Sequence, residues 1–154
     1  MKYYLLPSVI IASAFPFYAH AAITTVPFNS QVDATCTITL QSPGVLGQDG
    51  VSKLDSKAAG GRSGRAVVLT TGEGFNLSTT TPTAFSSSPA GVGAVTFDSS
   101  YRASGATFIA DTPGSTISRL GHGATNVDVD LSATANGFVF PLGRYTAEVT
   151  VTCE

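Results

Sequence analysis

The sequence predicts an all-β domain that folds as a two-sheet sandwich. Short runs of alternating apolar and polar residues recur along the chain, separated by turn signals rich in Gly, Pro and Asn. This pattern is typical of sandwich strands. After Ala21, no stretch repeats apolar residues at helical spacing. The chain is also rich in Thr, Ser, Gly, Ala and Val, which favours strands and turns. We therefore expect about seven to nine strands in one domain, residues 22–154.

The first 21 residues are expected to be a secretory signal peptide. Lys2 gives a positive end, residues 5–17 form an apolar run, and residues 19–21 (AHA) place small residues at the cleavage positions. The alternative is a membrane anchor. The run is too short to cross about 30 Å of hydrocarbon, and Pro7 and Pro16 interrupt it. We therefore predict cleavage after residue 21, export, and no membrane span in the exported chain.

The net charge argues against nucleic acid as a partner. The sequence has 8 Lys and Arg, 10 Asp and Glu, and a net charge of −2. Loss of Lys2 with the signal peptide makes this −3. Nucleic-acid binding requires clustered Lys and Arg, so no such partner is expected.

The exported chain begins with an alternating stretch of unusual length, residues 23–40. The apolar residues on one parity are Val26, Phe28, Val32, Ala34, Cys36, Ile38 and Leu40. Residues 29–33 predict a break between two extended pieces. Pro27 cannot donate a hydrogen bond to a sheet, so the residues before it belong at an edge or outside the fold. We expect an extended N-terminal segment, residues 22–34, followed by a strand that contains Cys36.

Two predictions concern the next part of the chain. Residues 41–64 contain many glycines and only short apolar pieces, so we expect a surface loop. Residues 65–71 (RAVVLTT) and 75–81 (FNLSTTT) carry strand signals on either side of the turn Gly72-Glu73-Gly74, which predicts a β-hairpin.

Further strands are expected at residues 94–104, more weakly at 107–110, and at 125–135. In the last of these, Val127, Val129, Leu131 and Ala133 are expected to face inward, with Asn126, Asp128 and Asp130 on the outer face. These oxygens do not form a calcium cage, because residues two apart on a strand are about 6.8 Å apart and Ca²⁺ needs six to eight oxygens within about 2.6 Å. We expect a solvated outer face and no metal site.

Residues 143–154 predict a core strand at the end of the chain. Tyr145, Ala147, Val149, Val151 and Cys153 share one parity, and Thr and Glu occupy most of the other. Such alternation is typical of a half-buried strand. No further residues follow to cover its edge, so an open edge is expected.

Cys36 and Cys153 are expected to form a disulfide. They are the two cysteines of the chain, and an even pair in an exported protein predicts a disulfide. Each shares a parity with apolar neighbours, so both sulfurs should face the core and bring the first strand near the last. A zinc site would need three or four ligands, and the exported chain offers these two Cys and His122.

No enzymatic chemistry is predicted, and no cofactor is expected. A nucleophilic triad needs a base beside the nucleophile, and His122 lies in a Gly-flanked loop. The acids Glu73, Glu148 and Glu154 lie in a turn, on an outward strand face and at the terminus, so no catalytic carboxylate pair is expected.

Both ends of the exported chain resemble known families. VPFNSQVDATCTITL, residues 26–40, resembles the opening of chaperone–usher pilus subunits, in which an alternating segment precedes a strand with the first cysteine. FPLGRYTAEVTVTCE, residues 140–154, resembles the closing strand of spore coat protein U-like secreted proteins, with its Pro-x-Gly-x-Tyr lead and alternating Thr and Val.

The resemblance implies an immunoglobulin-like sandwich that lacks its last strand and assembles into surface fibres in a Gram-negative bacterium. Like subunits, which add a strand to an open edge, and a periplasmic chaperone would be its partners. By resemblance, the donor side chains are Val26, Phe28 and Val32, and the acceptor groove contains Tyr145, Val149 and Val151. Two features differ from the pilus subunits. Their disulfide usually joins the first two strands, and the segment before Cys36 is short here.

Two functions are therefore carried forward. The first is a non-enzymatic structural protein of the bacterial surface or periplasm that acts in assembly or adhesion. The alternative is a self-contained secreted binding module for a glycan or protein ligand, in which residues 22–34 pair within their own domain.

Overall fold

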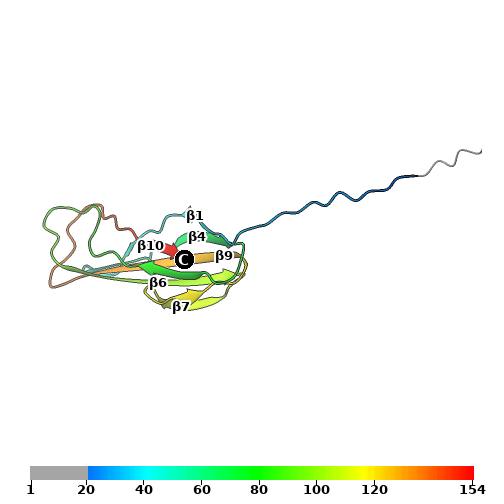
Figure 1. The fold of residues 1–154 in the computed structure, drawn as a ribbon. Coiled ribbons are helices and arrows are strands. Elements are labelled where there is room, and N and C mark those ends of the chain that lie inside the picture. Colours follow the sequence, from blue (N-terminus) through cyan, green and yellow to red (C-terminus); the bar gives the residue numbers. More distant parts are fainter. Residues whose placement is uncertain (1–20) are drawn as a thin grey trace, which may run out of the picture. The chain divides into compact units, whose positions relative to one another are not determined.

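The structure, a computed structural model, describes residues 21–154 (Figure 1). The predicted signal peptide therefore lies outside the described residues, apart from Ala21. The chain divides into two units after Ser30. Residues 21–30 contain no strand, and all of them are exposed. All the strands belong to the second unit, Gln31–Glu154.

Residues 31–154 form two antiparallel sheets, which confirms the predicted all-β, two-sheet class. The larger sheet contains β1 (Cys36–Ser42), β2 (Gly47–Gln48), β3 (Lys53–Asp55), β4 (Gly64–Thr70), β6 (Val95–Gly105), β7 (Ile109–Pro113) and β9 (Gly123–Ala135). The smaller sheet has the order β10 (Thr150–Cys153), β5 (Asn76–Thr80) and β8 (Ser118–Arg119). These are ten strands where about seven to nine were expected. The short strands β2 and β8, of two residues each, account for the excess.

The longest strand, β9, organises the larger sheet. One edge pairs with β6 from Thr125 to Ala135. The other edge pairs first with β4 and then with β3. Val127, Leu131 and Ala133 are buried and Val129 is half-buried, so the predicted inward face of this strand is confirmed.

The core lies between the sheets. Its most deeply buried members come from both: Val68, Tyr101 and Val127 from the larger sheet and Leu77 from the smaller one. Burying an apolar side chain of this size contributes about 1.5–3 kcal/mol. The Tyr101 hydroxyl is satisfied inside the core by the carbonyl oxygen of Thr116 at 2.8 Å and the hydroxyl of Ser118 at 2.7 Å.

The predicted hairpin of residues 65–71 and 75–81 is wrong. Strand β4 pairs with β1 and β9, whereas β5 pairs with β10 and β8. The Gly72–Gly74 turn therefore carries the chain from one sheet to the other. The content of β-branched and apolar residues identifies both strands correctly, but it does not determine which strand each one pairs with.

The prediction that residues 41–64 form only a surface loop is also wrong. Strand β3 pairs with β9 through Lys53↔Thr134 and Asp55↔Ser132, and Leu54 is buried. Strands β3 and β4 lie along the same edge of β9, separated by residues 56–63, which we call the 56–63 loop. The sheet is thus interrupted opposite Asp130 and Leu131. A single apolar residue, Leu54, is too weak a signal to predict such a short strand.

Two strand boundaries differ from the prediction. The weak strand expected at residues 107–110 is β7, which begins at Ile109 and extends to Pro113. The closing strand is shorter than residues 143–154, because ladder pairing begins only at Thr150. Before it, Tyr145, Ala147 and Val149 remain half-buried and alternate with exposed neighbours. The burial pattern of the closing strand is therefore as predicted, but before Thr150 its backbone pairing is an isolated bridge between Thr146 and Ser87 in place of a ladder.

Candidate functional site

The first and last strands of the domain are both edge strands. In the described residues, β1 pairs with β4 and β10 pairs with β5, and each leaves its other edge without a ladder. The predicted disulfide between Cys36 and Cys153 is confirmed, with a Cα–Cα distance of 6.4 Å. It joins the beginning of β1 to the end of β10, so the two free edges meet at one end.

An open groove separates these two edges. Its first part has a volume of about 400 Å³. The apolar side chains that line it are Leu40, Val45, Leu46, Ala66, Val129, Leu131, Ala147, Val149 and Val151. They come from β1, β4, β9 and the loop after β1, which contains Val45 and Leu46, and from the C-terminal segment, residues 143–154. The open groove therefore lies between the sheets, over the core.

The inward face of β1 is not covered. Leu40 stands opposite Ala66 and Ile38 opposite Val68, so all four face the same side of the sheet. Ala66 and Val68 are 6% and 0% exposed, whereas Ile38 and Leu40 are 39% and 71% exposed. The sequence placed Ile38 and Leu40 in the core with Cys36. Their exposure corrects that prediction, because no strand covers them in the described domain.

The groove continues toward the loops that begin the C-terminal segment. A second part, of about 810 Å³, shares Val45, Leu46 and Ala147 with the first and adds Phe140, Leu142 and Tyr145. Tyr145 belongs to a cluster of aromatic rings whose centroids are 4.8–6.1 Å apart: Phe85, Phe97, Phe138, Phe140 and Tyr145. The Tyr145 hydroxyl donates to the carbonyl oxygen of Pro141 at 2.6 Å. These contacts hold the loop wall of the groove in place.

The acceptor residues and the donor residues that the resemblance assigns lie in two different parts of the chain. Val149 and Val151 line the first part of the open groove, and Tyr145 lines the second. The proposed donor side chains Val26, Phe28 and Val32 are 68%, 93% and 80% exposed, and residues 21–35 contain no strand. Their roles as acceptor and donor remain predictions.

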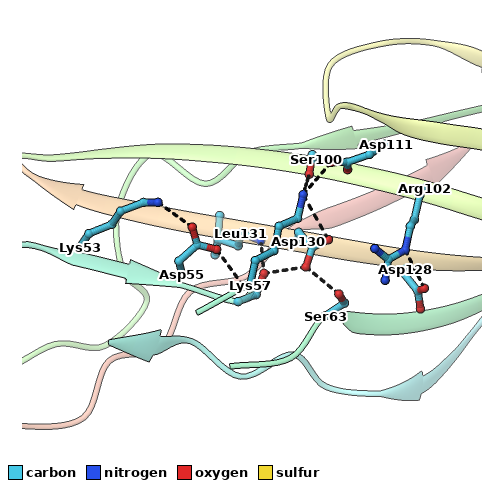
Figure 2. Close-up of polar contacts among 11 residues, drawn as sticks. Lys53, Asp55, Lys57, Ser63, Ser100, Arg102, Asp111, Asp128, Asp130 and Leu131 are labelled. Carbon is cyan, nitrogen blue, oxygen red and sulfur yellow. Dashed lines mark hydrogen bonds and ion pairs between the residues drawn. The ribbon is translucent and has the colours of Figure 1, made fainter. Parts of the chain in front are cut away.

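The sequence did not indicate a second feature, a polar cluster around Asp130 (Figure 2). Asp130 lies on the outer face of β9, as expected, but it is 3% exposed, so the predicted solvated environment is wrong for this residue. The hydroxyls of Ser56 and Ser63 donate to its Oδ1 at 2.7 and 2.6 Å. These serines are the two ends of the 56–63 loop, so one carboxylate closes the loop at its neck.

Lys57 completes this cluster. Its Nζ lies 3.7 Å from Oδ2 of Asp130 and 2.7 Å from Oδ2 of Asp111 on β7, and Figure 2 shows it between the two carboxylates. Its ammonium group thus occupies the position that a cation would take. Within residues 21–154, no three His, Cys, Asp or Glu side chains are grouped so that they would hold a metal ion. Because the contacts of Ser56, Ser63 and Lys57 join the 56–63 loop to β9 and β7, we assign the cluster a structural role.

The ion pairs change the pKa values of their members. The hydrogen bond from Lys57 lowers the pKa of Asp111 below its ordinary value of 3.8, and the same bond raises the pKa of Lys57 above 10.5. Burial acts to raise the pKa of Asp55. Hydrogen bonds from Lys53 and from the backbone N–H of Lys57, together with the charges of both lysines, outweigh burial and lower it.

Substitution Asp111→Asn is expected to destabilise the domain only at pH values where the carboxylate is ionised. Because the folded-state pKa of Asp111 is lowered, its contribution is present above the unfolded pKa of about 3.8 and is lost as the pH falls through the folded pKa. Lys57 and Asp111 are 45% and 51% exposed, so the loss at pH 7 should be under about 1 kcal/mol. Urea unfolding of wild type and variant should differ at pH 7 and converge as the pH falls below the folded-state pKa of Asp111. A difference that persists in acid would mean that packing, not charge, is involved.

The chain was compared with protein-family models, with curated proteins and with solved structures, and none of them matches it. None of residues 21–154 belongs to a helix long and apolar enough to cross a membrane.

Proposed function

We propose that this protein is a non-enzymatic, exported structural subunit of the bacterial surface or periplasm, which assembles with copies of itself by strand addition. The observation that supports this proposal is the exposure of Leu40, an inward-facing core position on an edge strand, beside the equally open edge of β10. Unpaired strand edges are liabilities that proteins either cover or use for association. An extended peptide in the groove would pair with the free backbone groups and cover the apolar floor.

The proposed occupant is the N-terminal segment, residues 22–34, of a second copy. Val26, Phe28 and Val32 lie on one parity, so their side chains would all enter the groove from one face of an added strand. Ala147, Val149 and Val151 also lie on one parity and line the groove wall, so alternate side chains from both segments would face each other across it. An exposed Phe28 in the free chain has apolar surface to bury on association, worth about 25 cal/mol per Å².

The compartment fits this proposal. A disulfide indicates an oxidising environment outside the cytosol, and the bond closes one end of the groove. We extend this to the periplasm or cell surface of a Gram-negative bacterium, where an immunoglobulin-like fold without its last strand would be completed first by a periplasmic chaperone and then by a neighbouring subunit.

The test measures self-association of the full exported chain by analytical ultracentrifugation across a range of concentrations. Wild type should form oligomers. A triple variant, Val26→Ser, Phe28→Ser and Val32→Ser, should be monomeric, and so should Leu40→Arg, which places a charge in the groove. Both should weaken self-association by at least about tenfold, which corresponds to about 1.4 kcal/mol.

Two matched controls use exposed apolar residues elsewhere. Phe108→Ser, at an 82% exposed phenylalanine, and Leu69→Arg, at a 47% exposed leucine on the outer face of β4, should assemble like wild type. A wild-type chain that stays monomeric at high concentration contradicts assembly. If the triple variant also unfolded that monomer, the result would favour the alternative in which the segment closes its own domain.

A further inference from the structure

Thr71 holds the residues that precede β1. Its backbone N–H donates to the carbonyl oxygen of Thr35 at 3.0 Å. Its hydroxyl accepts from the Thr35 N–H at 2.8 Å and donates to the carbonyl oxygen of Asp33 at 3.0 Å. These bonds continue the pairing of β1 with the β4 chain beyond Cys36↔Thr70. Residues 33–35 therefore continue in line with β1, bonded on the side away from the open groove.

Gly72 makes this arrangement sterically feasible. A Cβ at residue 72 would lie 2.8 Å from the Cβ of Ala34, closer than two carbon atoms can approach. Ala34 can thus lie against residue 72 only because that residue is glycine. We call Thr71 and Gly72, with the three residues they hold, the N-terminal clamp.

The N-terminal clamp determines what can fill the groove of the same chain. With residues 33–35 held, a chain reversal has to occur before Asp33. Even the tightest hairpin, with a two-residue loop at 31–32, would pair Phe28 with Thr35, and a three-residue loop at 30–32 would pair it with Ala34. In both registers Phe28 lies beside the clamp, at least five positions before Leu40, so it cannot cover the exposed part of β1.

Without the clamp, the register changes. A three-residue loop at 33–35 is a common hairpin length and would pair Val32 with Cys36 and Phe28 with Leu40. Both donor side chains would then face the inward side of β1. The sequence is thus compatible with closure of its own groove, and the hydrogen bonds to Thr71 oppose it.

We propose that Thr71 and Gly72 are positioning residues that keep the N-terminal segment out of its own groove and so reserve the groove for a second copy. This inference rests on the proposed function, because it assumes that residues 22–34 occupy a groove. It adds to that function the residues that determine whether the groove is filled by the chain's own N-terminal segment or by that of a second copy.

The test compares Thr71→Val and Gly72→Ala with wild type in the full exported chain. Two quantities are measured: the oligomer fraction, by ultracentrifugation, and the binding of a synthetic peptide of residues 22–34 to monomers, by fluorescence anisotropy. Both variants should become monomeric, and their affinity for the peptide should fall at least about tenfold, because their own segment occupies the groove. A merely destabilised domain would leave its groove open and would still bind the peptide.

Two controls make the test specific. Thr39→Val makes the same change at an exposed residue of β1 and should assemble like wild type. In the double variant Ala34→Gly, Gly72→Ala the clashing methyl group of residue 34 is absent, so assembly should recover relative to Gly72→Ala alone.

Each result decides the question. Clamp variants that assemble like wild type, or that are monomeric but bind the peptide normally, overturn the role of the clamp and leave the proposed function intact. If wild type does not assemble and its monomer does not bind the peptide, the proposed function fails and this inference fails with it. Monomeric variants that no longer bind the peptide, with recovery in the double variant, support the clamp.

Discussion

Replacement of both Cys36 and Cys153 by Ala is expected to lower the free energy of unfolding by about 4–5 kcal/mol. The two cysteines are 117 residues apart, and in the chain-entropy account a loop of this size restricts the unfolded chain by about 4.7 kcal/mol. Few other contacts join β1 to β10, so the bond is also the main link between the strands that flank the groove. A typical domain is stable by only about 5–15 kcal/mol, so this loss would be a large share.

The measurement is thermal and denaturant unfolding of the double variant beside the oxidised wild type. The melting temperature should fall by on the order of 15 °C. Reduction of wild type should give a similar loss, which controls for the change of side chain. A double variant as stable as the oxidised protein would mean that strand packing alone holds the two ends together.

Substitution Asp130→Ala is expected to cost about 3 kcal/mol. It removes two charge-assisted hydrogen bonds, from Ser56 and Ser63, each worth about 1.5–3 kcal/mol. The buried Ser56 hydroxyl still accepts from the backbone N–H of Leu131, but its own hydrogen loses its acceptor. Asp130→Asn keeps an oxygen at Oδ1 for the serines and should lose less, about 1–2 kcal/mol. Urea unfolding at neutral pH gives both values.

Trypsin cleavage is a second, independent measurement of the effect of Asp130→Ala, because Lys57 and Arg62 both lie in the 56–63 loop. Opening the neck of the loop in Asp130→Ala should accelerate cleavage at these two residues relative to the rest of the chain. The control is Asp128→Ala, on the same strand, where the carboxylate pairs with the exposed side chains of Arg65 and Arg102 and the loss should be under about 1 kcal/mol. Equal effects at positions 128 and 130 would contradict a special role for the buried carboxylate.

Alternation in the sequence correctly predicts strands and their inward faces. It identifies β6 and β9, and together with the export signal it predicts the pairing of Cys36 with Cys153. It does not predict strand partners, because a period of two describes only which side of a sheet a residue faces. For this reason β4 and β5 were expected to form a hairpin, although they belong to different sheets.

The candidate site was predicted only in part, for a related reason. Val149 and Val151 were expected in the groove, and they line it. The open inward face of β1 was not expected, because parity shows that Leu40 faces the interior and gives no information about whether another element covers it. The burial of Asp130 likewise depends on the 56–63 loop, which is opposite in space and distant in sequence, with Ser56 74 positions away.

The disulfide also sets an order of events during synthesis. Ribosomes add about 5–20 residues per second, so with 117 positions between the two sulfurs, Cys36 waits on the order of ten seconds for its partner. In a chain that is exported as it is synthesised, Cys36 is a free thiol in an oxidising compartment during that interval, and a cysteine of another exported chain is a wrong partner for it. Slower translation or crowding of export sites should therefore increase covalent Cys36–Cys36 dimers.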